Sequence, residues 1–436
     1  MQIESKLKVK VTRECNILED YEVYSAGFNE GLSLVKRKDK EIRSLGFIDT
    51  KGNEVIPCEY YDAYDFHCGR AMVEKDNWQG FINKKGEIVV PCVYHEATKF
   101  DFNYSVAKIS YISKDVNVVL DLNGRVLFAS SNDLTKILPH GYVVEKTNPN
   151  WHNNYKIWNL NESDYVKKIP FDNQIEPDVD ISGGFETFQY LGENYFCIGN
   201  YRGKFIVRIS GITGLEATKV KDNIKKVFIC SEGLIPALFS NGKMGYINWR
   251  GETIIPPKFD IAQDFKNGKA VVRYKKHYRV IDKNGVFCHK TKFKNSVTIT
   301  ENDLYITYDG KDHYYVDENN NNVFGKKFSV AHPFQNGIAL VLSKDEDEWY
   351  FIDTNGNKVT KTVTSEYEIS SIDELPEYSS IEILEYIYEV RNGEEVTYVR
   401  GETMEDCEKK LKDVINKINM DKLSEFVTSG YVKKME

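Results

Sequence analysis

The sequence predicts an all-β repeat protein, and three observations lead to that fold class. Residues 46–60 recur at 80–94 and again at 245–259, each copy with a central Lys-Gly or Arg-Gly and a later Pro. A period of this length indicates one small copied unit that cannot bury its apolar face alone. Tyr (28), Phe (23) and Gly (29) are plentiful, which suits short strands joined by turns.

The first recurring element is Phe-x-x-Gly followed by a short apolar run. A glycine at this place indicates a strand that starts from a turn needing positive φ or close backbone approach. The copies begin at Phe28, Phe66, Phe265 and Phe334, and a variant without the aromatic ring begins at Cys230.

The second element is a strand that runs into an Asp-x-x-Gly turn. Asp at the first position can accept hydrogen bonds from its own downstream backbone, and Gly relieves strain at the last position. Asp317 starts a similar turn with Asn320 in place of Gly, since Asn tolerates the left-handed region. A calcium loop there is disfavoured, because Phe328 stands where such a loop needs a bidentate Glu. The other turns begin at Asp49, Asp121, Asp282 and Asp353.

The third element is a return strand that ends in Pro and, three residues later, an aromatic residue. Pro lacks the donor that a central strand needs, so it should mark the strand's end or an outer edge. An Ala follows three residues after the aromatic and a Phe three after that, and these rings are expected to pack between adjacent repeats. The Pro and aromatic pairs are Pro57/Tyr60, Pro91/Tyr94 and Pro256/Phe259.

The turn glycines and their equivalents predict about nine three-stranded units. Successive turns lie 34 to 49 residues apart, and the copies near 162 and 211 are the weakest. An insertion at 169–184, rich in Asp, Pro and Gly, is expected to be a loop. The units could form a propeller-like ring or an open β-solenoid. Nine blades are many for one ring, so two rings or an open array stay alternatives to the preferred propeller-like arrangement.

Three parts follow from this pattern. They are an N-terminal strand or cap at 1–23, the repeat array at 24–362 and an acidic ββα C-terminal module at 363–436. A module of this kind could cap the exposed end of the array. Its acidity indicates a solvated face or, as the alternative, a docking surface for a basic partner.

The C-terminal module is predicted to contain a hairpin followed by helices. Strands are expected at 381–390 and 396–399, with Asn392-Gly393 as the hairpin turn. A helix should follow Thr403, which resembles the first residue of a capping box. A second short helix is expected before Gly430.

Composition excludes several classes of partner and location. The net charge of −8 arises almost entirely after residue 363, so the array lacks the basic surface that duplex nucleic acid needs. No stretch is apolar enough to span a membrane and the N-terminus has no signal-peptide core, so a cytoplasmic location is expected. Cys58 and Cys92 share a repeat position and should fill a small, half-buried apolar space rather than hold a metal.

These motifs resemble the bacterial WG-repeat family, also called KWG repeats. Its consensus has a Trp-Gly pair, Tyr-Ile-Asp, a Lys-Gly turn, an Ile-Pro-Pro-x-Tyr strand and then Phe-x-x-Gly-Leu-Ala, and the similarity covers about 24–360. The position of the family's Trp holds Leu45, Gln79 and Met244 here, and only Trp349 keeps the Trp. The resemblance implies an all-β repeat protein, usually without established enzymatic activity, and it carries over no site residue.

The chain contains no motif of an enzyme or a metal centre. Phosphate-binding, dinucleotide-binding, zinc-protease and nucleophile-elbow motifs are absent, and the eight histidines form no ligand-spaced pair. We therefore expect no catalytic residue, metal or cofactor, and a scaffold that binds a protein or peptide. A small-ligand or glycan sensor is one alternative, and an enzyme with a site at the array axis is another. The candidate binding residues are Trp151, Trp158 and Trp349, and the oligomeric state stays open.

Overall fold

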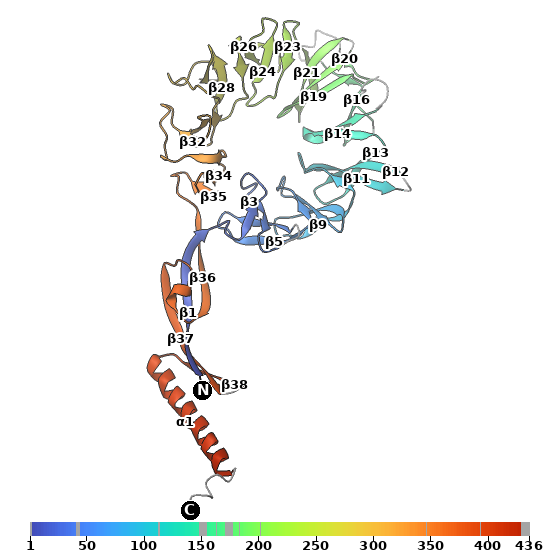
Figure 1. The fold of residues 1–436 in the computed structure, drawn as a ribbon. Coiled ribbons are helices and arrows are strands. Elements are labelled where there is room, and N and C mark those ends of the chain that lie inside the picture. Colours follow the sequence, from blue (N-terminus) through green and yellow to red (C-terminus); the bar gives the residue numbers. More distant parts are fainter. Residues whose placement is uncertain are drawn as a thin grey trace, which may run out of the picture. The chain divides into compact units, whose positions relative to one another are not determined.

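The chain forms two units, and Figure 1 colours them along the sequence. The computed structural model describes residues 2–40, 44–111, 114–147, 155–162, 164–170, 178–182, 184–200, 202–345, 347–392 and 394–428. Asp20–Val359 make up one unit, here termed the ring. Met1–Glu19 and Thr360–Glu436 make up the other, here termed the terminal unit.

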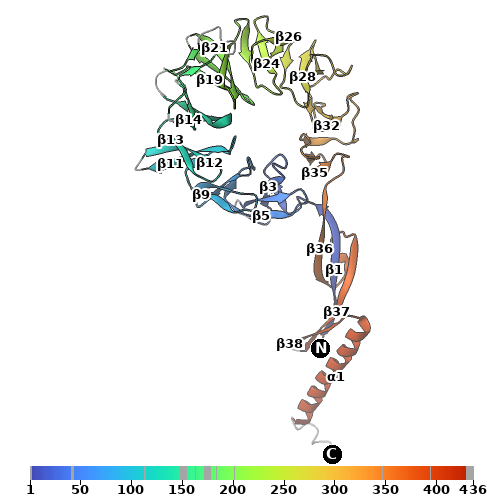
Figure 2. The ribbon, with the colours of Figure 1, turned by 180° about the vertical axis from the view of Figure 1, so that it is seen from behind.

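The ring consists of small antiparallel sheets, here termed blades, that follow one another along the chain (Figures 1 and 2). Five blades have four strands. They are blade 1 with β2 (Tyr21–Val23), β3 (Leu32–Arg37), β4 (Leu45–Asp49) and β5 (Glu54–Tyr60); blade 2 with β6 (Asp62–Ala63), β7 (Ala71–Lys75), β8 (Trp78–Ile82) and β9 (Ile88–Tyr94); blade 3 with β10 (Glu96–Ala97), β11 (Tyr104–Tyr111), β12 (Lys114–Asp121) and β13 (Val126–Ser130); blade 5 with β19 (Thr187–Gly192), β20 (Tyr195–Asn200), β21 (Gly203–Ser210) and β22 (Gly214–Lys219); and blade 6 with β23 (Ile224–Val227), β24 (Ile235–Phe239), β25 (Met244–Ile247) and β26 (Thr253–Phe259).

The other four blades have three strands each among the described residues. They are blade 4 with β14 (Asp133–Leu138), β15 (Tyr142–Lys146) and β16 (Tyr155–Asn159); blade 7 with β27 (Ile261–Ala262), β28 (Lys269–Tyr274) and β29 (His277–Asp282); blade 8 with β30 (Thr298–Ile299), β31 (Tyr305–Tyr308) and β32 (His313–Val316); and blade 9 with β33 (Phe328–Ala331), β34 (Ile338–Ser343) and β35 (Trp349–Asp353). Blades 8 and 9 join into one six-stranded sheet through the single pair His313 and Phe328. The predicted all-β array of about nine units is confirmed, with a fourth strand in five of them.

The predicted loop at 169–184 contains part of a small ribbon. Strand β17 (Lys168–Ile169) pairs with β18 (Val179–Asp180). Elsewhere in blade 4, a 3₁₀ turn, η1 (Pro139–Gly141), lies between β14 and β15. Residues 171–177 and 183 lie outside the described residues. The ends of the segment are therefore paired strands. Ile169 and Val179 anchor them, since both are fully buried in the core that blades 4 and 5 share.

A contact between two aromatic rings repeats from blade to blade and closes the ring. The aromatic residue of a third strand packs on the Phe of the next blade's Phe-x-x-Gly turn. This contact joins Phe351 of blade 9 to Phe28 of blade 1, with 4.8 Å between ring centroids. The structure is therefore a single closed ring rather than a solenoid or two rings. The same contact joins Phe47 to Phe66, Phe81 to Phe100, Tyr246 to Phe265 and Tyr315 to Phe334, at 4.7–5.2 Å.

A glycine after the slot accompanies the seven-residue fourth strands of blades 1, 2 and 6. A Cβ atom on Gly46, Gly80 or Gly245 would lie 2.4–2.6 Å from a carbonyl oxygen of that strand. The pairing register shifts at the same place, so the two strands approach closely around a bulge. Their fourth strands β5, β9 and β26 are each seven residues long. Blades 7, 8 and 9, which lack a fourth strand among the described residues, carry Arg279, Tyr314 and Tyr350 at this position.

The two predicted turns form as expected and lie at the same end of each blade. Asp49 Oδ1 accepts hydrogen bonds from the backbone N–H groups of Lys51 and Asn53, both at 2.9 Å. In the Phe-x-x-Gly turn, Glu30 and Gly31 have φ of 52° and 90°, which is the type I′ geometry of a tight hairpin. Pro57 lies in an edge strand, β5, where its missing N–H group costs no sheet hydrogen bond.

The terminal unit combines both ends of the chain in one sheet. Its strand order is β36 (Thr360–Ile369), β1 (Gln2–Asn16), β37 (Ser380–Asn392) and β38 (Glu395–Gly401), with the short η2 (Ile372–Glu374) between β36 and β37. Helix α1 (Met404–Thr428) packs Cys407, Leu411 and Val414 against Val390 and Val399. The N-terminal strand is thus a central strand of the C-terminal module.

Two predictions about the C-terminal module can be compared with the structure. The hairpin is confirmed, since Asn392 pairs with Glu395, while Gly393 lies outside the described residues. The prediction of two helices is wrong, because α1 runs without a break from Met404 to Thr428. No Gly or Pro occurs between these residues to end the helix earlier.

The acidity of the C-terminal module is partly balanced inside the terminal unit. Lys6 of β1 pairs with Glu389 of β37 at 2.8 Å, and Lys8 and Lys10 of the same strand also form ion pairs. Their partners are Glu366 at 2.8 Å and Glu382 at 3.8 Å. The chain therefore supplies a basic partner for this module itself, which weakens the idea of an acidic docking surface.

Candidate binding groove

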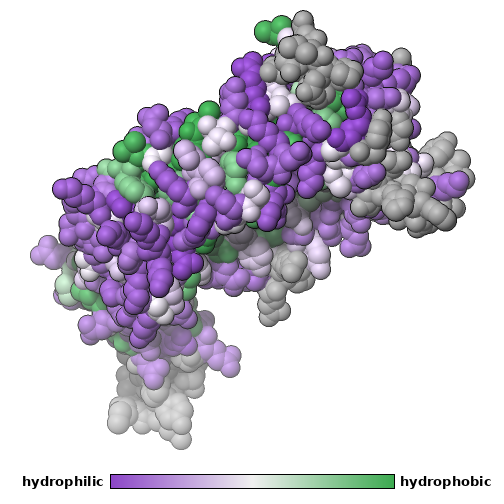
Figure 3. All heavy atoms as spheres, turned by 90° about the horizontal axis from the view of Figure 1, so that it is seen from above, coloured by the Kyte–Doolittle hydropathy of each residue, from purple (hydrophilic) through white to green (hydrophobic). Residues whose placement is uncertain are grey.

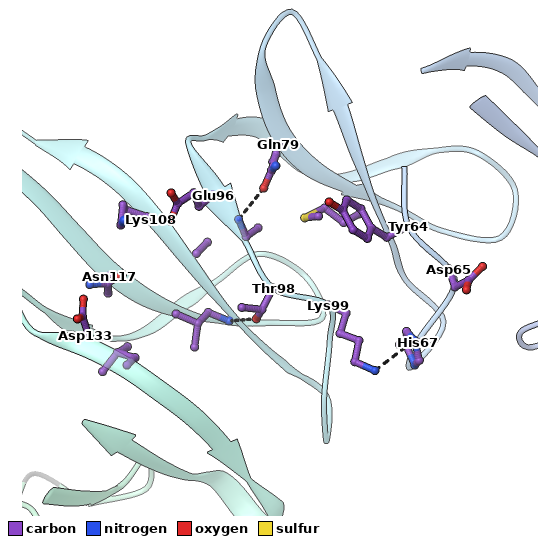
Figure 4. Close-up of a pocket in the computed structure, with 15 residues that line it drawn as sticks. Tyr64, Asp65, His67, Gln79, Glu96, Thr98, Lys99, Lys108, Asn117 and Asp133 are labelled. Atoms are coloured by element: carbon purple, nitrogen blue, oxygen red, sulfur yellow. Dashed lines mark hydrogen bonds and ion pairs between the residues drawn. The ribbon is translucent and has the colours of Figure 1, made fainter. Parts of the chain in front are cut away.

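A groove crosses blades 2, 3 and 4 of the ring. It encloses 710 Å³ and is lined by the first strands of blades 3 and 4, β10 and β14, and by the residues that follow β6 and β10 (Figure 4). These strands are the edges of their sheets. By contrast, hydrophilic residues cover most of the face in Figure 3, where hydrophobic residues form separate patches. The groove is therefore the better candidate for a binding site.

The groove lies where two blades carry polar side chains at one repeat position. This position, here termed the slot, lies four residues before the Asp or Asn that starts the second turn. In blades 1 and 6 the slot holds Leu45 and Met244, which are 0% and 8% exposed. In blades 2 and 3 it holds Gln79 and Asn117, which are half-buried and line the groove.

The slot residue decides how well the next blade's first strand is covered. Leu45 shares a core with Ala63 of blade 2, and Ala63 is 4% exposed. Met244 likewise shares a core with Ala262 of blade 7, which is 7% exposed. Ala97, the equivalent residue next to Gln79, is only half-buried and lines the groove. The polar slot residue thus leaves an apolar surface uncovered between blades 2 and 3.

Hydrogen bonds fix the polar side chains around this surface. Gln79 Oε1 accepts a hydrogen bond from the Ala97 backbone N–H at 2.6 Å (Figure 4). Asn117 Nδ2 donates to the carbonyl oxygen of Asn132 at 3.0 Å, and Thr98 Oγ1 accepts from the Val106 N–H at 3.0 Å. Gln79 Nε2 and Asn117 Oδ1 have no partner among the described residues, so a donor and an acceptor remain for a ligand.

Charges of both signs border the groove. Lys99 Nζ lies 3.5 Å from His67 Nε2 and forms no ion pair with a described carboxylate (Figure 4). Lys108 pairs with Glu96 at 2.9 Å, and this hydrogen bond raises the pKa of Lys108. Burial raises the pKa of Asp65, although Asn29, Ser25, His67 and Lys99 each act to lower it. Lys99 is therefore the cation that is most available to a ligand.

The tryptophans proposed from the sequence do not line this groove. Trp158 lies in blade 4, where its Nε1–H group donates to the buried Glu145 at 2.8 Å and its ring packs 5.0 Å from Phe128. Trp349 lies in β35 with its ring 6.0 Å from His332, and Trp151 lies outside the described residues. A binding role for these three residues stays a prediction. The departures at the slot, Gln79 among them, are the sequence signal that could have pointed to the groove.

A smaller cavity occupies a similar place between blades 5 and 6. It encloses 220 Å³ and is lined by residues of β19 and β23, the first strands of these blades. Phe188 and Cys197 contribute apolar lining, and Lys226 contributes a charge. Space between successive first strands therefore recurs in the ring, and the groove over blades 2 to 4 is the larger of these two examples.

The arrangement of His, Cys, Asp and Glu residues can be described only for the part of the chain that the structure covers. No group of three or more His, Cys, Asp or Glu residues there is arranged to hold a metal ion. All eight cysteines are free, and burial raises the pKa of the Cys58 thiol to about 12, which keeps it protonated. Cys58 and the half-buried Cys92 fill small spaces in the repeat, as expected. No described helix has the length and apolarity needed to cross a bilayer.

Four segments of the ring match the family model described as a WG containing repeat. They are residues 46–77, 80–110, 244–277 and 315–345. These segments are WG repeats. The groove lies mainly on the first two of them, and the slot is the position of the Trp after which the repeat is named. Each matched segment also contains the third strand of one blade and the first two strands of the next, so a WG repeat spans the junction between blades.

Solved structures resemble this chain only distantly. A eukaryotic initiation factor matches with 10% identity and a TM-score of 0.45, covering 86% of this chain and 97% of its own. The designed protein Ika8 matches with 10% identity and a TM-score of 0.33, covering 76% and 96%. BamB from Moraxella catarrhalis matches with 11% identity and a TM-score of 0.26, covering 67% and 81%. Such low scores carry no argument about function, and a search of curated proteins gave no match.

Proposed function

We propose that the protein is a non-catalytic scaffold that binds an extended segment of a partner protein in the groove over blades 2 to 4. The observation that carries this proposal is the groove itself, which is lined by the edge strands β10 and β14 of two successive blades. Its volume of 710 Å³ lies within the range of ligand-binding pockets. A repeat ring can present such a surface because its blades hold it rigid.

The lining suits a peptide better than a nucleic acid or a sugar. Edge strands offer backbone groups that an extended peptide can pair with, and Asp133 and Leu134 of the edge strand β14 border the groove. Lys99 and Lys108 are accompanied by Glu96, Asp65 and Asp133, so the groove lacks the one-sided positive charge that attracts nucleic acid. Tyr64 is the one aromatic residue among the described lining residues, which gives a sugar ring little to stack on.

Selection from a random peptide library displayed on phage tests this proposal. We expect peptides that bind the full-length chain and that protect 96–99 and 133–134 from hydrogen exchange. Leu134→Arg should abolish their binding, because it places a long charged side chain in the groove. The matched control is Ile212→Arg, which changes a residue that is 97% exposed in the β21–β22 turn of blade 5.

Two results would contradict the proposal. Peptides that bind the Leu134→Arg variant as tightly as the unchanged chain would place their site elsewhere. Enrichment of no peptide at all, together with binding to a glycan array, would favour the sugar-binding alternative instead.

A further inference from the structure

The chemistry of the bound peptide can be inferred from the apolar surface that Gln79 and Asn117 leave exposed. This inference rests on the proposed function. In blades 1 and 6 an apolar slot residue of the same chain covers the first strand of the next blade. In blade 2, Gln79 leaves the first strand of blade 3 partly uncovered, so Ala97 of that strand borders the groove. Val106, Ala107 and Met72, which are each at most 9% exposed as residues, contribute to the same apolar floor.

A large apolar side chain from outside would cover this floor. Burying it would remove apolar area of both partners from water, at about 25 cal/mol per Å². Anchors of this kind in concave pockets dominate the binding energy of many interfaces. The repeat itself has room for an aromatic ring at the slot, because the family consensus holds Trp there and Trp349 does so in blade 9.

The polar groups beside the floor define the rest of the occupant. The unpartnered Gln79 Nε2 donor and Asn117 Oδ1 acceptor match the C=O and N–H groups of a peptide backbone. Lys99 and His67, 3.5 Å apart and without a described carboxylate on Lys99, are complementary to an anionic group. An extended peptide with an aromatic residue next to an acidic one would satisfy all of these groups.

We propose that the groove binds an extended peptide whose aromatic side chain packs on Ala97 beside Gln79 and whose neighbouring carboxylate pairs with Lys99. The peptide thus supplies from a second molecule the aromatic side chain that the WG consensus places at this position within the repeat. The docking site thus lies where two blades of the array carry polar slot residues in place of an apolar or aromatic one.

Four defined peptide pools test this inference. Each pool contains fluorescein-labelled eight-residue peptides with either Trp or Ala at one fixed position and either Asp or Lys at the next. The full-length chain should bind the Trp-Asp pool at least about tenfold more tightly than the Ala-Asp and Trp-Lys pools, as measured by fluorescence polarisation.

Three variants test where the peptide binds. Gln79→Trp should refill the slot and weaken binding of the Trp-Asp pool by about tenfold or more. Met244→Trp makes the same change at the slot of blade 6 and should leave binding unchanged. Lys99→Glu alters an exposed side chain that folding does not need, and it should shift the preference from the Trp-Asp to the Trp-Lys pool. Circular dichroism melting of each variant checks that it folds.

The outcomes separate this inference from the proposed function. If Ala and Trp pools bind equally, or if folded Gln79→Trp binds as the unchanged chain does, the aromatic anchor is wrong. If Lys99→Glu keeps the preference for Asp, the carboxylate contact is wrong. Binding that Leu134→Arg abolishes but that shows no Trp or Asp preference would overturn this inference and leave the groove as a docking site. Absence of binding by every pool would overturn both.

Discussion

Gly80 illustrates, at the scale of single residues, how the repeat constrains its own sequence. Its position admits no Cβ atom, because the Val90 carbonyl oxygen would lie 2.6 Å from it and the Cys92 backbone would lie 2.7 Å away. The two strands of the bulge would have to separate to admit even a methyl group. The second residue of the WG pair is therefore a backbone requirement, whereas the first residue, at the slot, is a question of packing.

We expect Gly80→Ala to lower the free energy of unfolding by about 1–3 kcal/mol, because it forces backbone atoms apart. Urea denaturation followed by circular dichroism measures this change. Gly27→Ala is the matched control, since the atom nearest to its new Cβ is the flexible end of the Gln335 side chain at 2.7 Å. Equal effects of the two substitutions would show that the bulge does not impose the glycine.

The residue-scale role of Trp158 can be separated from a role in binding. Trp158→Phe would leave Glu145 Oε2 without its donor in a residue that is 4% exposed, at a cost of about 1–3 kcal/mol. Thermal melting measures this loss, and peptide binding should not change. Trp78→Phe is the control, because that ring is 38% exposed and a smaller loss is expected. Weaker peptide binding by the Trp158→Phe variant would instead support a role of Trp158 in binding.

At the scale of elements, the Phe-x-x-Gly turns are joined from blade to blade by glutamates. The carboxylate of Glu30 in blade 1 accepts a hydrogen bond from the Gly69 N–H of blade 2 at 3.1 Å and pairs with Lys84 at 3.1 Å. Glu232 of blade 6 does the same with Gly268 at 3.0 Å and Lys283 at 2.9 Å in blade 7. A turn that is tight for local reasons thus also fixes the spacing of neighbouring blades.

The pH dependence of stability should reveal these links. Partial burial on its own raises the pKa of Glu30 and Glu232, but the bonds from Lys and from the glycine amide outweigh it and lower both pKa values below the usual 4.5. Such a group stabilises the fold above its unfolded pKa, and the stabilisation is lost as the pH falls through the folded pKa.

A double variant tests this pH dependence. Glu30→Gln with Glu232→Gln should lower Tm at pH 7 by about 1–3 °C, and the difference from the unchanged chain should shrink between pH 5 and pH 3. Glu87→Gln, in the second turn of blade 2, is a suitable control. A deficit in Tm that is the same at pH 7 and pH 3 would contradict an electrostatic origin.

Local chemistry made some elements predictable from the sequence, and long-range packing hid others. The Asp49 turn and the edge position of Pro57 follow from single residue types, so they were predicted correctly. The first strands of the blades were missed, because β6 and β10 have two residues each and leave no periodic pattern. The groove was missed because it exists only where Gln79 leaves the surface around Ala97 exposed. The sequence alone does not show that Ala97, in the next blade, lies beside Gln79.

At the scale of the whole molecule, two kinds of contact keep the ring closed. One is the packing of Phe28 on Phe351 between the first and last blades. The other is the pairing of β1 with β36, which begins with Asn16 opposite Thr360, directly where the chain enters and leaves the ring. This pairing holds the two ends of the ring segment together, so closure does not depend on one interface.

We expect damage to the terminal sheet to loosen the junction of blades 1 and 9. Val9→Asp with Val11→Asp would place charges at positions that are 0% and 1% exposed and should disrupt that sheet. Hydrogen exchange should then become faster in β3 and β34 but not in β7 of blade 2. Unchanged exchange in β3 and β34 would mean that the contact between Phe28 and Phe351 is sufficient for closure.

The pairing of Asn16 with Thr360 also has a consequence for how the array can change in length. For the sheet of the terminal unit, the entire ring is the connection of one antiparallel hairpin, β1 to β36. The entropic cost of such a connection grows only slowly with its length. Duplication or loss of a blade within the segment therefore leaves both paired ends where they are, and the terminal sheet can accept inserts with different blade numbers without any change in its own residues.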